Sequence, residues 1–451
     1  MNGQEVIRKT TSFCPECKTT IPAEVIKKDG KIFLCKLCPE HKAQDYFLGE
    51  AKYHESLEDF YFKIRKNINK PIVSVELVVN FSCNMNCPVC FLGDNFDTLK
   101  NFDPTVNEIE SFIKKTKYKS FVISGAEATC RDDLFEIIKI LKKYSKTVGI
   151  NTNGLKLAEF SYVKKLKAAG VDRVNLQFSG FNSDAEKYLR GEDYINQKLK
   201  ALENLNKLNI AVGLNALIAG NCNEDQIGNI IEMVSAYRVI KMVNFGSMVF
   251  TGLAKDYPRK NYIMPDDLLR FAQEQTKNKI KRQSVYIFKK LEIVIASFFN
   301  KDTCFYHHLY LIVKKKNSYK PIDKFLNLEK IESVLEQYKN IYGRSSFMAK
   351  IYLIMILPYL LIINYKIILI LGEIFQMFFS YFFKKANFLK QRNIIYLLFF
   401  VECDVLRIDY DIFNKCPFKS IFFFDKSNNG FQKKRDPIEN HYWFLWKDKK
   451  N

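Results

Sequence analysis

Short apolar runs and longer amphipathic stretches alternate along the chain between residues 72 and 245. The short runs are rich in β-branched residues and predict strands at residues 72–80, 120–124, 147–152, 173–178, 210–218 and 241–245. Apolar residues recur at helical spacing between them and predict helices at residues 104–116, 132–144, 158–169, 184–190, 197–208 and 224–236. Strands that alternate with helices in this way form parallel βα units. We therefore expect an α/β fold built on a partial, TIM-like (β/α)6 barrel, with its active site at the carboxyl ends of the strands.

The alternation ends near residue 256, and a different pattern follows. Residues 266–299 predict helix, residues 309–325 predict a hairpin, and residues 393–446 are β-like. We therefore expect an α+β extension after the barrel. The chain then divides into a metal-binding unit with its linker, the barrel, a helical and hairpin extension, an apolar segment and a β-like end. These parts span residues 1–69, 70–255, 256–346, 347–392 and 393–451.

The chain carries a large basic excess, because 70 Lys and Arg residues against 49 Asp and Glu residues give a net charge of +21. Such a surplus attracts polyanions such as nucleic acid, anionic lipid or a phosphorylated substrate. A lysine-rich but otherwise ordinary solvated surface explains the same number, so the charge alone selects no partner. With 47% hydrophobic and 26% charged residues, the composition excludes a disordered chain and a polytopic membrane protein.

Seven of the twelve cysteines lie before residue 91, in closely spaced groups. Close spacing favours metal binding by thiolates over a disulfide framework, and so a reducing compartment. Residues 1–13 are polar and lack the apolar stretch of a signal peptide. We expect a cytoplasmic protein.

Cys83, Cys87 and Cys90 follow the first predicted strand in the spacing Cys-x3-Cys-x2-Cys. A [4Fe–4S] cluster usually takes four thiolates, so three would hold three irons and leave the fourth open. The open iron can chelate an amine and a carboxylate of one ligand, which the methionyl end of S-adenosylmethionine (SAM) presents. Electron transfer into the sulfonium would release a 5′-deoxyadenosyl radical, which is chemistry of the cofactor that the barrel directs. A three-cysteine zinc site is the alternative.

This motif and several downstream segments resemble the radical SAM superfamily over about residues 72–255. The resemblance implies that Gly125, Ala126 and Glu127, at the end of the second strand, meet the SAM ammonium, although alanine follows Glu127 where the family commonly has proline. An ordinary turn with an exposed glutamate is the alternative for this segment. The resemblance also implies contacts with the ribose, carboxylate or adenine of SAM for polar residues at the later strand ends, namely Asn151, Asn153, Gln177, Ser179 and Asn215.

Two further cysteine pairs lie near the N-terminus. Cys14-x2-Cys17 and Cys35-x2-Cys38 are separated by seventeen residues, which is typical of a zinc ribbon or a rubredoxin-like knuckle pair. Four thiolates would close a tetrahedral site for one Zn²⁺ or one mononuclear iron. His41 is a substitute ligand, a neighbour of the ligands or a surface histidine.

Together the two motifs resemble one radical SAM subgroup, which holds the archaeal tetraether lipid synthases and the dihydropterin methylases. These enzymes couple lipid chains or methylate a pterin precursor, and they carry additional iron–sulfur clusters near the C-terminus. This chain departs from the pattern, because no Cys-x2-Cys pair follows residue 91. Cys304, Cys403 and Cys416, with a fourth ligand such as His307, could hold one auxiliary cluster. Free cysteines in a core are the alternative.

Residues 348–383 are unusually apolar and aromatic, but Pro358, Lys366 and Glu373 interrupt them. Neither apolar run reaches the roughly 20 residues of a membrane span. The basic residues at 384–392 suit an interfacial helix on anionic lipid, which would place the protein peripherally on the cytoplasmic face of a membrane. A buried helical core and a membrane span are the alternatives.

The hypothesis that follows is a radical SAM transferase that abstracts hydrogen from an unactivated carbon. Carbon–carbon bond formation or alkylation of a lipid or pterin-type small molecule would follow, with electrons from a donor such as ferredoxin or flavodoxin. Nucleic acid is not an expected partner. One alternative is an RNA- or peptide-modifying radical SAM enzyme that docks its substrate with the ribbon. The other is a non-catalytic metal-bearing binding protein, against which the intact cysteine motif and Glu127 argue.

Overall fold

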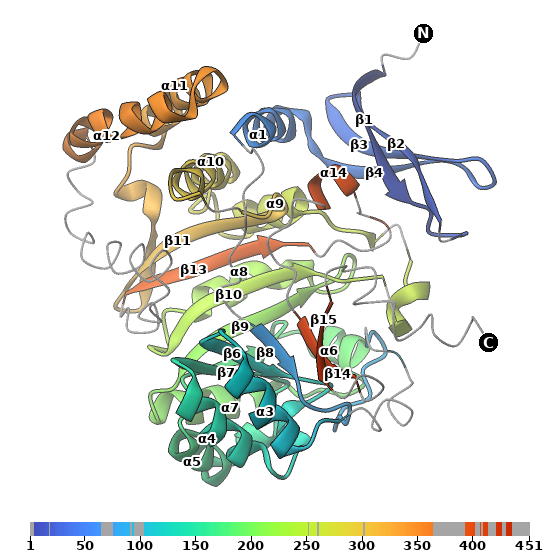
Figure 1. Cartoon of the computed structure of the whole chain (residues 1–451), viewed down its shortest axis with the longest axis vertical. Coiled ribbons are helices and arrows are strands. Elements are labelled where there is room, and N and C mark those ends of the chain that lie inside the picture. Colours follow the sequence, from blue (N-terminus) through green and yellow to red (C-terminus); the bar gives the residue numbers. More distant parts are fainter. Residues whose placement is uncertain are drawn as a thin grey trace.

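The structure, a computed structural model, contains two sheets of four and eleven strands in the residues that it describes. These residues are 4–17, 19–64, 75–90, 93, 103–250, 252–258, 261–300, 303–363, 393–401, 406, 409–413, 421–425 and 430–434. The small sheet lies at one end of the molecule, next to a group of helices, and the large sheet runs through its centre (Figure 1).

The small sheet is antiparallel, in the order β1-β2-β3-β4. Its strands are β1 (Glu5–Phe13), β2 (Thr20–Lys28), β3 (Lys31–Cys38) and β4 (Lys42–Glu50), and α1 (Ala51–Ile64) follows. Asp29 and Gly30 both adopt positive φ, as a two-residue hairpin between β2 and β3 requires. Val25, Ile32 and Leu34 are completely buried and belong to the main hydrophobic core, so one face of this sheet packs against the rest of the protein.

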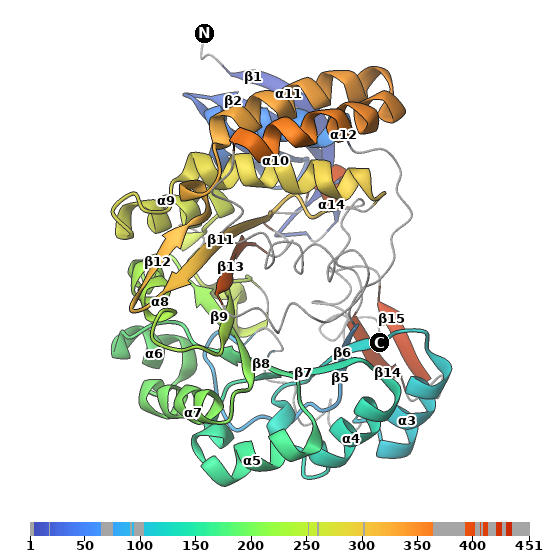
Figure 2. The same ribbon diagram turned by 90° about the vertical axis from the view of Figure 1, so that its left-hand side faces the viewer.

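Six parallel strands form the centre of the large sheet and follow one another in sequence order. They are β5 (Val75–Val78), β6 (Ser120–Ser124), β7 (Thr147–Thr152), β8 (Arg173–Gln177), β9 (Ala211–Ile218) and β10 (Ile240–Ser247). Each overlaps a strand that the sequence pattern predicts. The helices between them are α3 (Val106–Lys115), α4 (Leu134–Tyr144), α5 (Phe160–Ala169), α6 (Ser183–Arg190), α7 (Ile195–Lys207) and α8 (Ile227–Met233). They cover the outer face of a curved sheet (Figure 2).

Local sequence explains where several of these helices begin and end. Thr105 and Glu108 form a capping box that starts α3. Gly170 ends α5 in the left-handed conformation that glycine adopts without strain. Aliphatic strand residues such as Ile150 and Leu176 are completely buried, so helix packing on the sheet accounts for much of the core.

Further strands extend the large sheet at both edges. Beside β10 lie β13 (Ile394–Phe400), β11 (His307–Lys315) and β12 (Ser318–Pro321), and beside β5 lie β14 (Ile421–Asp425) and β15 (Gly430–Lys434). The hairpin expected at 309–325 is confirmed by β11 and β12. In the segment expected to be β-like, the described residues include β13, β14 and β15 together with a short helix at Tyr410–Phe413. The insertion of these strands into the barrel sheet is a feature that the pattern did not predict. Among the described strands β12 and β15 are the two edges, so these strands form an open, curved sheet.

The remaining helices are α9 (Pro265–Gln275), α10 (Arg282–Phe298), α11 (Leu328–Arg344), α12 (Ser346–Ile363) and α14 (Tyr410–Phe413). The single helix expected at 266–299 is two helices, because Lys277 and Asn278 adopt positive φ between them. Strands from both sides of the boundary expected at residue 255 share one sheet, and the five-part division of the chain stays a prediction.

The apolar segment is described only up to the end of α12, and the rest of residues 348–383 lies outside the described residues. Phe347, Met348 and Met355 of α12 are more than half exposed. In the part of the chain that the structure describes, no helix has both the length and the apolar character that crossing a membrane requires.

Candidate active site and metal centre

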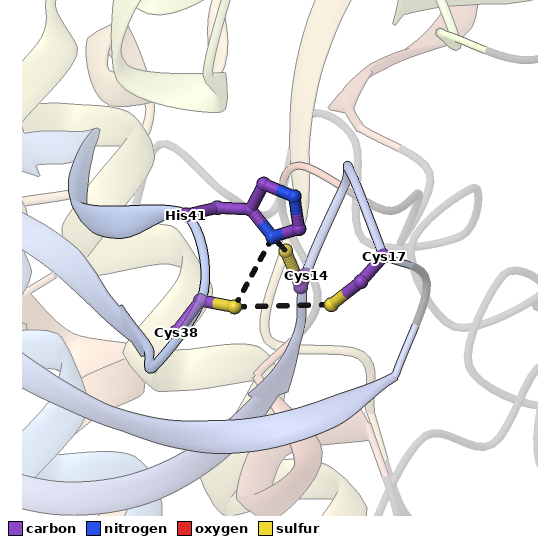
Figure 3. Close-up of side chains that lie close together, drawn as sticks. All are labelled: Cys14, Cys17, Cys38 and His41. Atoms are coloured by element: carbon purple, nitrogen blue, oxygen red, sulfur yellow. Dashed lines mark hydrogen bonds between the residues drawn. The ribbon is translucent and has the colours of Figure 1, made fainter.

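Four metal-ligating side chains meet at two turns of the small sheet (Figure 3). Cys14 and Cys17 lie in the turn after β1, while Cys38 ends β3 and His41 lies in the turn after it. Their ligand atoms all lie within 4.8 Å of one another. The distance from Cys17 Sγ to Cys38 Sγ is 3.8 Å, and His41 Nδ1 lies 3.4 Å from Cys38 Sγ and 3.7 Å from Cys14 Sγ.

These separations fit one tetrahedral metal ion. With zinc–sulfur bonds of about 2.3 Å and zinc–nitrogen bonds of about 2.0 Å, tetrahedral angles place two sulfurs about 3.8 Å apart and sulfur and nitrogen about 3.5 Å apart. The hydrogen bond with the Thr19 hydroxyl lowers the pKa of the Cys17 thiol to about 6. Burial opposes the ionisation of Cys38, but the hydrogen bond with His41 leaves its pKa lowered. Both thiols are therefore shifted toward the thiolate, which is the metal-binding form.

Cys35 does not belong to this set, which corrects the expected four-cysteine site. Strand β3 includes both Cys35 and Cys38. Two residues three apart in an extended strand point to opposite faces, so the two side chains cannot share one metal ion. Burial, followed by a hydrogen bond with Asp45, raises the pKa of the Cys35 thiol to about 12. His41 takes its place.

A repeat in the sequence marks His41 as the fourth ligand. Residues 14–17 read Cys-Pro-Glu-Cys, and residues 38–41 read Cys-Pro-Glu-His. Proline after the first ligand favours a turn, and a turn brings the ligands of a knuckle together. The Cys35-x2-Cys38 spacing also resembles a knuckle, but these two cysteines lie in a run of residues with strand character.

The Cys-x3-Cys-x2-Cys motif lies directly after β5, at the carboxyl end of the strand as expected. The Asn80 side-chain amide fixes the start of this loop by donating to the backbone carbonyls of Ser82 and Glu127. Gly125 packs directly on Asn80, because a Cβ at Gly125 would lie 2.2 Å from Asn80 Oδ1. The Ala126 N–H donates to the Asn80 carbonyl at 3.0 Å. Gly125 and Ala126 thus hold the end of β6 against the start of the cysteine loop.

Cys83, Cys87 and Cys90 are all partly exposed. The Cys90 N–H donates to the Cys87 carbonyl at 3.1 Å, and the Cys90 carbonyl accepts from the Leu253 N–H at 2.9 Å. Burial raises the pKa of the Cys83 thiol to about 12, so metal binding there must displace a proton. Three thiols on one partly exposed loop are the donor set that a [4Fe–4S] cluster with one open iron requires.

Glu127 is buried, with both carboxylate oxygens hydrogen-bonded within the chain. Oε1 accepts from the Thr129 N–H at 3.1 Å, the Thr129 hydroxyl at 2.6 Å and the Thr152 hydroxyl at 2.7 Å. Oε2 accepts from the Asn153 N–H at 2.6 Å. Because Glu127 is only 2% exposed, the alternative of an exposed glutamate in an ordinary turn is wrong. Its carboxylate ties the end of β6 to the end of β7.

Three of the expected SAM-binding positions, Asn153, Gln177 and Ser179, lie at or just beyond the ends of β7 and β8. The Asn153 amide at the end of β7 donates to Asn84 Oδ1 of the cysteine loop at 2.8 Å. The Gln177 amide at the end of β8 donates to Ser179 Oγ at 2.7 Å. These residues are therefore anchored side chains at the carboxyl ends of the strands.

Two other expected positions lie within the sheet. Asn151 is hydrogen-bonded to Glu76 and Asn175, and Asn215 accepts a hydrogen bond from the Asn244 amide at 2.7 Å. The structure therefore places these amides among the side chains of the strands and shows no bond from them to the cysteine loop in the described residues.

Arg190, at the end of α6, is a candidate that the sequence analysis did not identify. Its Nη2 donates to Ser179 Oγ at 3.4 Å, and its Nε is buried with no hydrogen-bond partner among the described residues. A buried guanidinium N–H without a partner among the described residues is unusual, and guanidinium groups bind anions strongly, so Arg190 is a candidate anion-binding residue. A basic residue before a helix-ending glycine usually reflects the helix dipole, so the sequence pattern gave no functional indication.

Cys304 is buried in the main hydrophobic core. In the described part of the chain it belongs to no group of three or more metal-ligating side chains, and His307 begins β11. Cys403 and Cys416 lie outside the described residues. An auxiliary cluster on these cysteines stays a prediction.

Two segments of the chain match known families. Residues 6–46 match the HMPTM N-terminal zinc ribbon domain, and residues 77–234 match the radical SAM superfamily. The chain therefore carries a radical SAM domain, and relatives that are named as enzymes support an enzymatic function. This family implies a [4Fe–4S] cluster and SAM, and the cysteine loop after β5 lies inside the matched segment.

Individual relatives of this radical SAM enzyme include two curated proteins. It is 26% identical over 377 residues to a 7,8-dihydro-6-hydroxymethylpterin dimethyltransferase of Methanocaldococcus jannaschii. This alignment covers 75% of this chain and 74% of the dimethyltransferase. It is 28% identical over 174 residues to a probable GTP 3′,8-cyclase of Pyrococcus abyssi, which covers 38% of this chain and 56% of that protein. Among solved structures, Streptococcus suis SuiB bound to precursor peptide SuiA has 17% identity and a TM-score of 0.40, covering 53% of this chain and 50% of that chain.

Proposed function

We propose that this enzyme forms a carbon–carbon bond, or adds an alkyl group, at an unactivated carbon of a pterin-type small molecule. The observation that carries the proposal is the match to the pterin dimethyltransferase, which covers 75% of this chain, against 38% for the cyclase. Pterins and the guanine of GTP share a 2-amino-4-oxopyrimidine ring. Both relatives are therefore named for compounds that contain this ring.

We assign the cluster to Cys83, Cys87 and Cys90, and SAM to the strand ends beside them. When bound, these two groups supply a carbon-centred radical that removes hydrogen from an unactivated carbon. The chain itself binds and orients them. Ser179 offers a donor to the SAM carboxylate, and so does Arg190 Nε, which has no hydrogen-bond partner among the described residues. Guanidinium groups bind carboxylates strongly.

Glu127 acts in this proposal as a positioning residue. Its four hydrogen bonds hold Thr129, Thr152 and Asn153 in place, and a contact with the SAM ammonium would compete with them. The backbone of residues 125–127 is then left to accept from the ammonium, while Asn153 remains beside the cysteine loop for the ribose hydroxyls.

The ribbon supports this function from outside the barrel. We propose that Cys14, Cys17, Cys38 and His41 bind one zinc or iron ion, which stabilises the N-terminal sheet. Electrons come from a protein such as ferredoxin or flavodoxin, and we place the enzyme in the cytoplasm.

A lipid substrate is the second candidate, and the exposed apolar side chains of α12 favour it. Phe347 and Met355 are 70% and 75% exposed, as on a helix that rests on a membrane surface. The test is flotation with anionic vesicles, comparing the wild type with a double variant, Phe347→Ser and Met355→Ser. Flotation of the wild type alone supports membrane contact. If the wild type does not float with the vesicles, membrane contact is contradicted.

Anaerobic turnover with 7,8-dihydro-6-hydroxymethylpterin tests the main proposal. We expect the reduced wild type to release 5′-deoxyadenosine and to form an alkylated pterin, both detected by mass spectrometry. Cys87→Ala should lose both products, whereas Cys222→Ala, a matched change outside the cysteine loop, should retain them. Release of 5′-deoxyadenosine by Cys87→Ala would contradict the cluster assignment, and release without any pterin product would contradict the substrate.

A further inference from the structure

The inner face of the curved sheet carries amide side chains. Helices cover the outer face of this sheet (Figure 2). Strand residues such as Ile150 and Leu176 belong to the main hydrophobic core and are completely buried. Their neighbours Asn151 and Asn175 point to the opposite, inner face, because side chains alternate along a strand, and they are only half-buried. Polar groups inside a protein are costly unless they meet a partner, so an amide-bearing, partly accessible face is suited to binding a polar ligand.

Two of these amides and one carboxylate form a hydrogen-bonded row, which we call the Glu76 row. It consists of Glu76 on β5, Asn151 on β7 and Asn175 on β8. Asn175 Nδ2 donates to Asn151 Oδ1 at 2.7 Å, and Asn151 Nδ2 donates to Glu76 Oε1 at 3.3 Å and, in a longer contact, to Ser124 Oγ at 3.5 Å. Gly213 on the next strand leaves room for this arrangement, because a Cβ there would lie 2.9 Å from Asn175 Oδ1. The donors of both amides point toward Glu76, so these two bonds have one direction, and the Glu76 carboxylate accepts the second of them.

The Glu76 row lies below the residues assigned to SAM. Asn151 lies on β7 two residues before Asn153, which directly follows the strand, and Glu76 precedes Asn80 by four residues on the chain. Two residues of strand span about 7 Å, so a ring bound to the row would lie directly beneath the cysteine loop and SAM. This is the side of SAM that faces into the sheet.

Apolar side chains continue the inner face on neighbouring strands. Met242 of β10 and Leu398 and Phe400 of β13 point to this face and are half-buried, like the amides. A flat heteroaromatic ring needs polar groups at its edge and apolar contacts on its faces, and the inner face offers both.

One edge of a 2-amino-4-oxopyrimidine ring presents two N–H donors beside a carbonyl acceptor. A carboxylate accepts two parallel N–H bonds, and an adjacent amide can donate to the carbonyl. Glu76 beside Asn151 has this complementary order. We propose that Glu76 and Asn151 bind this edge of the substrate ring, while Asn175 fixes the orientation of the Asn151 amide. The inference rests on the proposed function and moves Asn151 from SAM binding to substrate binding.

The test is anaerobic fluorescence titration of the full, cluster-reconstituted chain with three probes. These are 7,8-dihydro-6-hydroxymethylpterin, its 2-oxo analogue (7,8-dihydro-6-hydroxymethyllumazine) and GTP. Glu76→Gln keeps the shape but replaces one acceptor oxygen with a donor. We expect it to weaken pterin binding about 10- to 100-fold, the range for a hydrogen bond to a charged group. It should strengthen binding of the 2-oxo analogue, whose extra carbonyl can accept from the new amide. Glu203→Gln, exposed on α7, is the matched control and should bind all probes as the wild type does.

The outcomes separate this inference from the proposed function. A wild type that binds neither pterin nor its analogue overturns the proposed function. A wild type that binds pterin, with unchanged preference in Glu76→Gln, overturns the role of Glu76 alone. If the wild type binds GTP more tightly than pterin and Glu76→Gln weakens GTP binding, Glu76 recognises the ring edge, but the substrate that carries the ring is not a pterin. Asn151→Asp is the second variant. It should weaken the binding of pterin and of its 2-oxo analogue alike, because both carry the 4-oxo group. Unchanged binding of both ligands overturns the role of Asn151.

Discussion

Replacing His41 by alanine is expected to release the metal ion of the ribbon, whereas replacing Cys35 by alanine is expected to leave it bound. The prediction separates the ligand set of the structure from the four-cysteine set that the spacing suggests. His41 Nδ1 lies within 3.7 Å of two cysteine sulfurs. Cys35 points to the other face of β3 and is paired with Glu24 and Asp45 across the sheet.

The size of the effect follows from the number of ligands. Structural zinc sites contribute about 10–16 kcal/mol, so one of four ligands accounts for about 3–4 kcal/mol. Water can occupy the vacated position and restore part of this, so we expect His41→Ala to weaken metal binding about 100-fold. Cys35→Ala removes one buried sulfur and should cost about 1 kcal/mol of ribbon stability, without a change in metal affinity.

Competition with a chromophoric zinc chelator under anaerobic conditions measures the affinity directly. His41→Cys is the informative control, because it rebuilds a four-thiolate site at the observed position and should retain the metal. If Cys35→Ala released metal as readily as His41→Ala, the ligand set described above would be refuted.

Three other perturbations test the barrel. Gly125→Ala places a Cβ 2.2 Å from Asn80 Oδ1 and should abolish SAM binding in equilibrium dialysis. Gly343→Ala, whose Cβ meets no heavy atom within 4 Å, should bind SAM normally. Equal SAM binding by the two variants would contradict the role of the contact between Gly125 and Asn80. Glu127→Ala leaves four donors without their acceptor and should lower the free energy of unfolding by about 3 kcal/mol or more in urea titrations, and an unchanged midpoint would exclude a positioning role. Burial, followed by the charge of Arg190, lowers the pKa of Lys198 to about 8 from 10.5. The unfolded chain therefore binds more protons between these pH values, and the stability of the wild type should rise with pH there relative to Lys198→Met; parallel curves would contradict this.

The core of the fold could be predicted because its information is local. Each βα unit carries its own periodicity, and short connections make parallel strands follow one another in order. The place of β13 could not be predicted, since it pairs with β10 across about 150 residues and its apolar run, residues 394–400, would suit any buried strand. The break between α9 and α10 was also hidden, because Lys277 and Asn278 adopt positive φ without a glycine to mark the turn.

The same division applies to the site. The cysteine loop was predictable, since three ligands lie within eight residues and directly follow a strand. Spacing alone failed for Cys35, because a Cys-x2-Cys pair has different geometry in a strand and in a turn. The hydrogen bonds of Glu127 depend on segments that meet only in the folded chain. So does the burial of Arg190 Nε, which lacks a partner in the part of the chain that the structure describes.

Strand alternation links the two binding functions proposed for this sheet. Asn151 lies on β7 in the Glu76 row, and Asn153, the first residue after β7, lies beside the cysteine loop. Since a strand is stiff over two residues, a ligand held at one position has a fixed distance to a ligand held at the other. A shift of β7 by one residue would turn Asn151 toward the helices and expose Ile150 on the inner face. The completely buried Ile150 and Val148 therefore do more than fill the core, because the register that they fix also sets the distance between cofactor and substrate.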